Sequence, residues 1–306
     1  MVKNILPPKP SRRNFIINEV DTPTKYAEWD QAKFVIIPVP YDGTASYRAG
    51  AREAPRAILD ASEYIEPYDY ELKKNSYQAG IYTRADVMVS LLPGKMHDNI
   101  YLAVEEVVDA DKVPVILGGE HSITYPAVKA VHKKYPNLTV LYFDAHGDLR
   151  QTWEDSPLSH ACSAKRIHDL GCRIVEVGIR SISEDEHKLI DKARDIDVIW
   201  SSEVHENLEL AIKKITKLLP KPASPIYLSF DLDCFDPAYM PATGTPEPGG
   251  LTWHQVMSIL KTVLPRYNIV GFDAMELSPI IGGTLHYPAA TAAKLVYKII
   301  GLTSKI

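Results

Sequence analysis

Three side chains of the metal-ligating type stand at alternate positions after an apolar run near the middle of the chain: Asp144, His146 and Asp148. The run, residues 138–143, is rich in β-branched and aromatic residues, which predicts a buried strand. Alternate side chains of an extended backbone point to the same side, so these three would face one another. The spacing is typical of a metal site, although in isolation it also fits a polar turn whose aspartates cap a helix.

A second cluster of the same kind strengthens the metal interpretation. Residues 226–230 predict another buried strand, and Asp231 and Asp233 follow it with the same two-residue spacing. The loop is not an EF-hand, because Phe235 and Asp236 stand where that motif needs an acid or amide and then a glycine. Two strand ends therefore carry clusters of possible ligands.

Two further predicted strands end in residues that can act beside a metal. His121 follows residues 113–117, and Asp273 and Glu276 follow residues 269–272. The carboxyl ends of parallel strands meet at one edge of a sheet, where α/β proteins bind their ligands. A lone histidine at a strand end is more often structural, so His121 is a candidate ligand only because acids are expected around it.

The number of acids decides which metal chemistry is expected. So many carboxylates at one edge would raise one another's pKa and cost stability unless cations neutralised them. Four aspartates and two histidines exceed what one tetrahedral zinc takes, and they suit two divalent ions with shared carboxylates, oxygen-rich ligation favouring Mn²⁺. Two such ions, roughly 3.5–4 Å apart, lower the pKa of a shared water, which predicts metal-assisted hydrolysis.

A third histidine lies on the polar loop after the first cluster. His160 stands twelve residues past Asp148, where it is well placed to shuttle protons at the rim of a metal site. The alternative is a histidine that merely neighbours a helix start. The sequence alone leaves both interpretations open.

Strands and helices alternate along the chain, and this alternation predicts an α/β fold with a mostly parallel sheet. Residues 1–31 are proline-rich and are expected to form an N-terminal arm, and residues 32–306 contain no linker and are expected to form a single domain. Ser122 is a candidate cap for the helix after His121. The predicted strands are residues 33–39, 113–117, 138–143, 173–177, 197–200, 226–230 and 269–272, and the predicted helices are residues 55–65, 96–109, 123–134, 163–170, 208–219, 253–264 and 289–300.

Composition excludes several classes of protein. The net charge is −5 without a long basic run, so nucleic acid is not an expected partner, while a small cationic substrate would not be repelled. No apolar stretch approaches the roughly 18 residues of a membrane span, and the N-terminus lacks a signal-peptide core. Three cysteines without C-x-x-C spacing argue against a disulfide framework. A cytoplasmic protein without a membrane partner is expected.

The same residues carry a family resemblance. From about Phe34 to the C-terminus, four motifs in order resemble those of the ureohydrolases, the arginase and agmatinase family. They are Gly-Gly-Glu-His-Ser at 118–122, Asp-Ala-His-Gly-Asp at 144–148, Ser-Phe-Asp-Leu-Asp at 229–233 and Asp-Ala-Met-Glu at 273–276. The resemblance implies a three-layer α/β/α fold and the hydrolysis of a guanidino group to an amine plus urea with two manganese ions per chain.

The resemblance also implies a role for each site residue. Asp144 and Asp231 would bridge the two ions, His160 would shuttle protons, and Glu276 would grip the guanidinium, with Asp148 counted beside them in the active site. The family usually forms trimers or hexamers, so a homo-oligomer is expected. One ion would be held by His121, Asp144, Asp148 and Asp231, and the other by His146, Asp144, Asp231 and Asp233.

Several motifs resemble agmatinases more than arginases: Pro-Tyr-Asp-Gly-Thr at 40–44 with Ser-Tyr-Arg-Ala-Gly at 46–50, Gly-Gly-Glu-His rather than Gly-Gly-Asp-His at 118–121, and Ser-His-Ala-Cys at 159–162. Arg150 stands where arginases have an amide, and Gly178 to Ser183 has serines where arginases have aspartates that grip the amino acid end of arginine. Agmatine, which would yield putrescine and urea, is therefore the expected substrate, with arginine, guanidinobutyrate and aminopropylagmatine as alternatives. Arg150 is awkward beside a cationic substrate, so it is expected to point away or to pair with Glu154 or Asp155.

Two other classes of function compete with this interpretation. A deacetylase of related topology would use one zinc, but Asp148 and Asp233 would then have no role. A protein that only binds metal or a polyamine would not need His160 and Glu276. Both are less favoured than a guanidino hydrolase.

Overall fold

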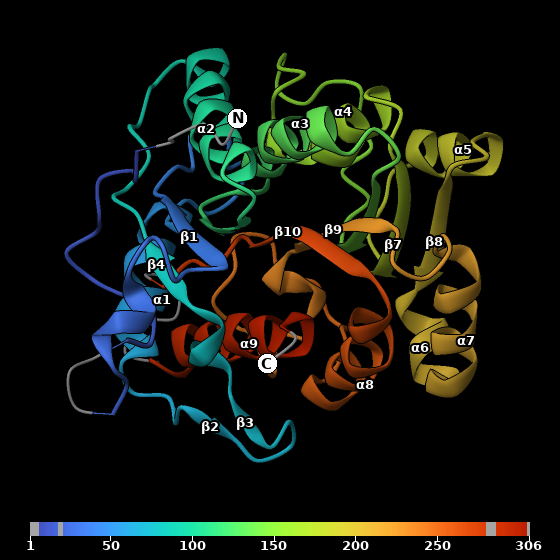
Figure 1. The fold of residues 1–306 in the computed structure, drawn as a ribbon. Coiled ribbons are helices and arrows are strands. Elements are labelled where there is room, and N and C mark those ends of the chain that lie inside the picture. The colour runs from blue at the N-terminus through green and yellow to red at the C-terminus, as the bar shows by residue number, and fades with distance from the viewer. Residues whose placement is uncertain (1–5, 18–20, 280–285, 305–306) are drawn as a thin grey trace.

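A single sheet of eight strands organises the molecule (Figure 1). The computed structural model describes residues 6–17, 21–279 and 286–304. Every pair of neighbouring strands in this sheet is parallel, in the order β4-β1-β5-β10-β9-β6-β7-β8. The strands are β1 Phe34–Val39, β4 Ile81–Thr83, β5 Val113–Gly118, β6 Thr139–Phe143, β7 Arg173–Ile179, β8 Ile196–Trp200, β9 Pro225–Phe230 and β10 Asn268–Ala274.

Helices cover both faces of the sheet, so the fold has three layers, α/β/α, as expected (Figure 1). One face packs against α1, α6, α7, α8 and α9, and the other packs against α2, α3 and α4, with α5 beside them. The helices are α1 Ala54–Ser62, α2 Pro93–Asp109, α3 Thr124–Lys134, α4 Ser163–Asp169, α5 Glu184–Lys192, α6 Ser201–Glu206, α7 Leu208–Leu218, α8 Trp253–Val263 and α9 Tyr287–Thr303.

The central strands are buried on both sides because helices lie above and below them. All six residues of β1 and all five of β6 are buried. Continuous runs of Val, Ile, Leu and Phe supply this double burial, which is why an apolar run without polar alternation predicts these strands well. The rigid sheet fixes the positions of the residues that follow each strand.

Several short elements were not expected from the sequence, α6 among them. β4 has three residues, and α5, Glu184–Lys192, is almost entirely polar, with Glu186 as its one buried residue. Neither offers the long apolar pattern by which buried elements are recognised. A hairpin of β2, Tyr68–Asp69, and β3, Lys74–Asn75, lies outside the main sheet.

The segment expected to be an N-terminal arm contributes to the core. Its described residues contain one 3₁₀ turn, η1 Thr24–Ala27, and are otherwise irregular, which agrees with their proline content. Yet Phe15 and Ile16 are fully buried. The backbone N–H groups of these two residues donate to Thr83 Oγ1 at 3.0 Å and to Ser62 Oγ at 2.9 Å. This segment is therefore tied to β4 and α1.

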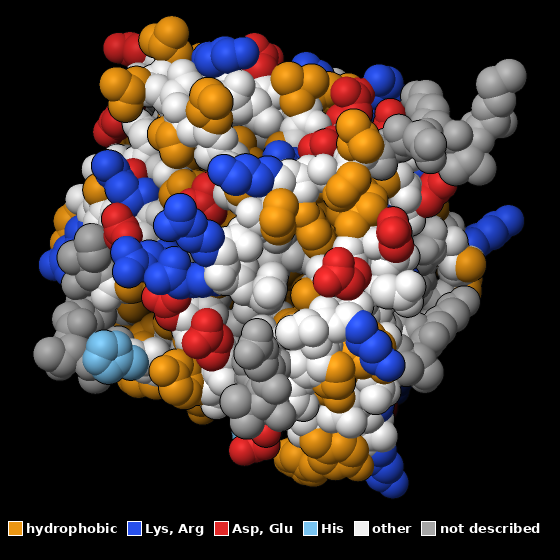
Figure 2. Space-filling model, turned by 60° about the vertical axis from the view of Figure 1, so that its left-hand side comes forward, with side chains coloured by type: hydrophobic (Ala, Val, Ile, Leu, Met, Phe, Trp, Pro, Cys, Tyr) orange, Lys and Arg blue, Asp and Glu red, His pale blue; other side chains and the backbone are white. Residues whose placement is uncertain are grey.

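The surface carries charges of both signs mixed with apolar side chains, as the face in Figure 2 shows. Among the helices that the structure describes, none is both long and apolar enough to cross a membrane. Both observations agree with the composition of the chain.

Candidate metal centre

The sheet order brings the predicted ligands together. β5, β10, β9 and β6 are consecutive neighbours in the sheet, and all four run in the same direction. His121 follows β5 and Asp231 follows β9, while Asp144 follows β6. Residues from three loops that are far apart in the sequence therefore meet at one edge, as the topology rule for parallel sheets requires.

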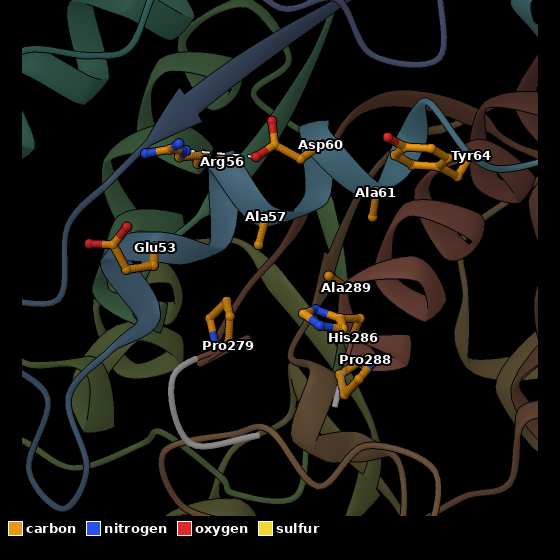
Figure 3. Close-up of a pocket in the computed structure, with 10 residues that line it drawn as sticks. All are labelled: Glu53, Arg56, Ala57, Asp60, Ala61, Tyr64, Pro279, His286, Pro288 and Ala289. Atoms are coloured by element: carbon orange, nitrogen blue, oxygen red, sulfur yellow. Dashed lines mark ion pairs between the residues drawn. The ribbon is translucent and has the colours of Figure 1, made fainter. Parts of the chain in front are cut away.

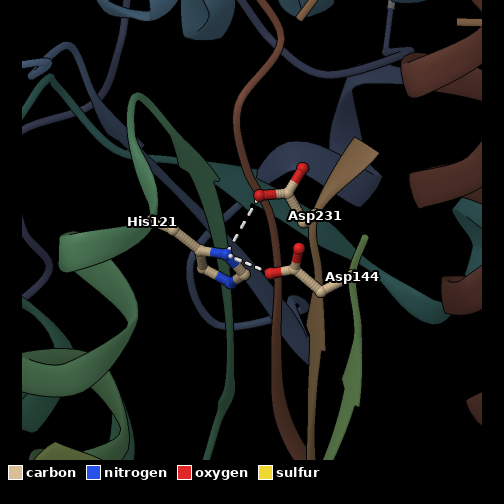
Figure 4. Close-up of side chains that lie close together, drawn as sticks. All are labelled: His121, Asp144 and Asp231. Atoms are coloured by element: carbon tan, nitrogen blue, oxygen red, sulfur yellow. Dashed lines mark ion pairs between the residues drawn. The ribbon is translucent and has the colours of Figure 1, made fainter. Parts of the chain in front are cut away.

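The first group of ligand-type atoms centres on His121 (Figure 4). Its Nδ1 lies 3.0 Å from Asp144 Oδ2 and 3.0 Å from Asp231 Oδ2, and 3.4 Å from Asp148 Oδ2. His121, Asp144 and Asp231 each offer one atom within 4.8 Å of the others, and all three are buried.

The second group shares a member with the first. His146 Nδ1 lies 3.1 Å from Asp233 Oδ2 and 3.5 Å from Asp144 Oδ1. Asp144, His146 and Asp233 again lie within 4.8 Å of one another. Because Asp144 belongs to both groups through its two oxygens, the two groups are adjacent. The residues therefore fit a binuclear site.

Unsatisfied atoms at the centre support a bound cation. His121 Nδ1 and Asp144 Oδ2 are buried and have no hydrogen-bond partner. Buried polar atoms without partners are costly, and a cation would accept both lone pairs. His121 Nε2 lies 2.8 Å from Ser229 Oγ, which donates its own proton to Asp273 Oδ1 at 3.0 Å. Ser229 therefore accepts from Nε2–H, which leaves the Nδ1 lone pair free for a ligand.

Asp273, one of the strand-end acids, belongs to this supporting layer. It is fully buried and lies within β10. Besides Ser229, it accepts hydrogen bonds from Thr124 Oγ1, Tyr227 Oη and the backbone N–H of Phe230. With all these donors, its charge is satisfied by the protein, and it holds His121 through Ser229.

In each of the two aspartate loops, a hydrogen bond within the loop fixes the backbone. The N–H of His146 donates to Asp144 Oδ1 at 2.6 Å, and the N–H of Asp233 donates to Asp231 Oδ1 at 2.7 Å. Each first aspartate thus uses one oxygen to fix the residue two positions on, which is an Asx turn. Its other oxygen faces His121.

The backbone departs from the extended form expected between Asp144 and Asp148. Asp148 has a φ of 48° and Glu276 a φ of 65°, both in the left-handed region that residues with a side chain rarely adopt. Asp148 is held in this turn because its carbonyl accepts from Lys165 N–H and its Oδ2 accepts from Tyr142 Oη at 2.9 Å. Strained residues of this kind cluster at functional sites.

The carboxylates repel one another in the absence of a cation. Burial, and then the charge of Asp144, raises the pKa of Asp148 well above its ordinary value. Burial, followed by Asp233 and Asp144, does the same for Asp231. Divalent cations would relieve this repulsion, which agrees with the charge argument made from the sequence.

A cavity of about 220 Å³ opens above the two groups. Glu276 is buried there, and its Oε1 accepts the backbone N–H of His121 at 2.8 Å and lies 3.8 Å from His160 Nδ1. The cavity is lined by Ser46, His146, Gly147, Asp148, Arg150, Trp153, His160, Ala161, Ser181, Ile182, Glu186, Asp231, Thr245 and Glu276.

His160 is held by a loop that sequence reasoning did not connect to it. Its Nε2 lies 3.0 Å from Ser46 Oγ, and its backbone N–H donates to Thr44 Oγ1 at 3.0 Å. Burial, and then the neighbouring His146 and His121, lowers the pKa of His160 to about 4. No local pattern around Ser46 signals a contact with a histidine 114 positions away. The neutral imidazole can accept or donate a proton at either nitrogen.

The position of Arg150 differs from the prediction that it points away or pairs with Glu154 or Asp155. It lines the cavity, and neither Glu154 nor Asp155 is its partner among the described ion pairs. Its guanidinium carbon lies 4.4 Å from the centre of the Trp153 ring, and its Nε lies 3.9 Å from Glu186 Oε2. The two acids occupy an exposed turn with φ values of 48° and 60°, and this tight turn carries them away from the cavity lining.

A second correction concerns the helix start after β5. Ser122 does not cap it; instead the Glu120 side chain accepts from the N–H of Ser122 at 3.0 Å. Ser229 and Tyr142 were also not expected to support the centre. Ser229 stands two positions before Asp231 on a strand, so the two-residue period could have placed it on the same side.

Comparison with known proteins identifies the family. The model of the arginase family matches residues 32–301. An N(1)-aminopropylagmatine ureohydrolase of Synechocystis sp. is 36% identical over 293 residues, which cover 92% of each chain. An agmatinase of Pyrococcus horikoshii is 35% identical over 284 residues, covering 90% of this chain and 93% of the relative. The chain therefore belongs to the arginase family.

Solved structures agree with the sequence comparisons. The agmatine ureohydrolase of Thermoplasma volcanium superposes with a TM-score of 0.83 at 32% identity, covering 96% of this chain and 94% of that one. The class of enzyme supported by these comparisons is a hydrolase of guanidino groups. This agrees with the resemblance carried by the four motifs.

Proposed function

We propose that the protein is a binuclear manganese hydrolase that cleaves a guanidino group to an amine plus urea. The observation that carries the proposal is the pair of ligand groups sharing Asp144 beneath a cavity that contains Glu276 and His160. One ion would be held by His121, Asp144, Asp148 and Asp231, and the other by His146, Asp144, Asp231 and Asp233. When bound, two divalent ions supply a nucleophile by lowering the pKa of water.

Glu276 would orient the substrate. Its Oε1 is held by the His121 N–H, so the carboxylate is fixed in direction. Burial, and then the charge of Glu120, raises the pKa of Glu276 well above its ordinary value. A guanidinium would favour its ionised form and would be bound through parallel hydrogen bonds, which places the guanidinium carbon in one position.

His160 would move the proton that the leaving amine needs. The bond between the guanidinium carbon and the nitrogen that carries the alkyl chain breaks, and this departing nitrogen must take up a proton as it becomes an amine. His160 lies 3.8 Å from Glu276 and contacts Ser46 on the exposed side. It is therefore positioned between the substrate site and the cavity mouth, as a proton carrier should be.

The expected substrate is agmatine, with its N(1)-aminopropyl derivative as the second candidate. Ser181 and Ser183 donate to Glu247 and Glu186, and both serines stand where arginases have aspartates, so nothing at these positions grips an α-amino acid end. The second candidate is favoured by the names of two relatives, from Synechocystis sp. and Thermococcus kodakarensis, which are 36% and 38% identical.

Urea release tests the proposal directly. The Mn²⁺-loaded protein is assayed in parallel with agmatine, N(1)-aminopropylagmatine, arginine and 4-guanidinobutyrate, and bound manganese is counted by mass spectrometry. We expect urea from one of the two amines and two ions per chain. Binding of two ions without urea from any guanidine would favour a protein that only binds metal or polyamine. One bound zinc with deacetylase activity would contradict the proposal outright.

The oligomeric state stays a separate prediction. A homo-oligomer, trimer or hexamer, is proposed on the family resemblance alone, and light scattering on the eluted protein tests it. A monomer would leave the hydrolase proposal intact, because every residue invoked above comes from one chain.

A further inference from the structure

The described residues that line the cavity fall into a floor and a rim. The floor carries the groups already assigned to the guanidino end of the substrate. The rim holds one arginine, Arg150, one aromatic ring that is not a histidine, Trp153, and one further carboxylate, Glu186. The far end of a guanidino substrate must meet this rim, because the floor takes the guanidinium. The floor consists of His146, Asp148, His160, Asp231 and Glu276.

The three rim residues contact one another. The Arg150 guanidinium lies over the Trp153 ring, 4.4 Å from its centre, which is the geometry of a cation–π contact. Arg150 Nε lies 3.9 Å from Glu186 Oε2, too far for a hydrogen bond. The Arg150 side chain is 36% exposed, so solvent screens this ion pair. Arg150 is therefore held loosely.

The Glu186 carboxylate, in contrast, is held firmly and can accept a further hydrogen bond. It is buried, and its oxygens accept from the N–H of Leu149 at 3.0 Å and from the N–H and Oγ of Ser183, each at 2.7 Å. Two carboxylate oxygens can accept about four hydrogen bonds. One acceptor direction is left for a cation at the rim.

Trp153 is also fixed. Its N–H and carbonyl exchange hydrogen bonds of 3.0 Å with Ser156 across a two-residue turn. Glu154 and Asp155 form that turn with positive φ values, which is the twist that a tight hairpin requires. The indole is thus presented by a short closed hairpin. The Arg150 side chain, in contrast, is partly exposed and has only the two loose contacts given above.

We propose that Arg150 is the resident cation of the subsite for the far ammonium of the substrate, and that a bound substrate displaces it. This rests on the proposed function, and it narrows the substrate class to guanidines with a cationic nitrogen at the far end of an alkyl chain. Such a nitrogen seeks an aromatic face and a carboxylate, and the rim offers Trp153 and Glu186. Arg150 already holds both, and two cations cannot share them without repulsion.

Displacement would also open the rim for a longer amine. The Arg150 side chain would swing into solvent, where its charge is well hydrated. A secondary ammonium bound at Trp153 could then extend an aminopropyl group along the path that Arg150 has left. A substrate with a far carboxylate would behave in the opposite way, because it would pair with Arg150 and hold it in place.

Kinetics with a charge series separates these cases. The manganese-loaded enzyme and its Arg150→Gln variant are compared with agmatine, butylguanidine and 4-guanidinobutyrate, which differ only at the far end. We expect KM for agmatine to fall roughly three- to tenfold in the variant, with kcat unchanged. KM for butylguanidine should stay the same, because a neutral end does not compete with Arg150.

Three further variants serve as controls. Arg150→Lys keeps the charge and should keep KM for agmatine near that of the unaltered enzyme. Trp153→Leu removes the ring and should raise KM for agmatine more than KM for butylguanidine. Arg56→Gln makes the same charge change in a different cavity beside α1, where Arg56 lies 3.7 Å from Asp60 (Figure 3), and should leave KM unchanged.

A binding measurement keeps the test independent of turnover. Calorimetric titration with putrescine, the diamine that agmatine hydrolysis would leave, should show tighter binding to Arg150→Gln than to the unaltered enzyme. An unchanged or higher KM for agmatine, or weaker putrescine binding, would overturn the proposal. Loss of activity on 4-guanidinobutyrate without any fall in KM for agmatine would identify Arg150 as an anion clamp instead. Absence of hydrolysis with tighter diamine binding in the variant would refute the proposed function but not this subsite.

Discussion

Two clusters of acids in this protein differ in what neutralises them. Beside the C-terminal helix α9, Lys298 contacts Asp69 at 3.0 Å and also Glu71, and Lys261 contacts Glu71 as well. At the strand ends, no described lysine or arginine lies within ion-pair distance of Asp144, Asp148, Asp231 or Asp233, and the side chains that do lie this close are histidines. The first cluster is complete as the chain folds. The second is complete only with cations from outside.

The difference separates structural acids from functional ones. A buried or partly buried carboxylate that serves stability is satisfied by the chain itself, by lysines as at Asp69 or by several hydrogen-bond donors as at Asp273, because an unpaired charge in such a place is costly. A carboxylate that awaits a metal cannot have a lysine partner, because an ammonium would occupy the metal position. The missing lysines at the strand ends are therefore as informative as the acids themselves. Four substitutions test this comparison.

The largest effect is expected for Asp144→Asn, which removes the acid shared by both ligand groups. The amide keeps the shape but loses the charge, so both ions should bind more weakly and urea release should fall by roughly 10³-fold or more. Metal content and kcat measure the two effects. Asp155→Asn, in an exposed turn, is the matched control. Two firmly bound ions with unchanged kcat in Asp144→Asn would place the centre elsewhere.

A smaller effect is expected where the ligand stays and its support is lost. Ser229→Ala removes the acceptor that fixes the tautomer of His121. Loss of such a partner typically weakens metal binding 10- to 100-fold. One of the two ions should be affected, because His146 has no contact with Ser229. A titration with a competing chelator resolves the two affinities, with Ser258→Ala on α8 as control. Equal weakening of both ions would show that the two groups do not act separately.

The comparison also marks what the sequence could predict. The strands and their terminal acids follow from local features, since an apolar run defines a strand and the sheet direction gathers the residues after it. The contacts at the cavity rim cannot be predicted from local sequence, because packing brings distant loops together there. Ser46 contacts His160 across 114 positions, and Arg150 lies near Glu186 rather than near the acids of its own loop. The burial of Phe15 could likewise not be predicted, because the irregular segment that contains it has no apolar pattern.

Glu176 is a third kind of acid, which has neither a lysine partner nor a place among the metal ligands. It lies in β7, is fully buried, and neither carboxylate oxygen has a hydrogen bond. Burial, and then Asp144 and Asp148, raises its pKa well above the ordinary value. The native state thus holds a proton that the unfolded state loses, so its contribution to stability is present at low pH and declines as pH rises above the ordinary pKa.

Glu176→Gln should therefore raise the free energy of unfolding by about 1–3 kcal/mol at neutral pH and leave it unchanged well below the ordinary glutamate pKa. Burial is the largest cause of the shift, so the sign holds with or without bound cations. Urea denaturation at several pH values measures the difference, and Glu206→Gln, at an exposed position of α6, is the control. A destabilised variant at neutral pH would show that Glu176 is charged and paired in solution.

The smallest effect is expected for Glu71→Gln in the lysine cluster. Hydrogen bonds from Lys261, and then from Lys298, lower the pKa of Glu71 to about 2. A lowered pKa means that Glu71 adds stability above the ordinary value of 4.5 and that this contribution disappears as pH falls toward 2. Because the Glu71 side chain is partly exposed and solvent screens its ion pairs, the loss on substitution should be only about 0.5–1 kcal/mol at neutral pH.

Thermal unfolding of Glu71→Gln against Glu66→Gln, a nearby exposed glutamate, measures this difference. The difference in Tm between the two variants should disappear as the solution is acidified, and added manganese should not change it. Stability of the unaltered protein should, in contrast, rise with manganese, because the ions bind the native state and complete the strand-end cluster. If manganese changed the gap between the two glutamate variants, the two clusters would be coupled, and the division into structural and functional acids would fail.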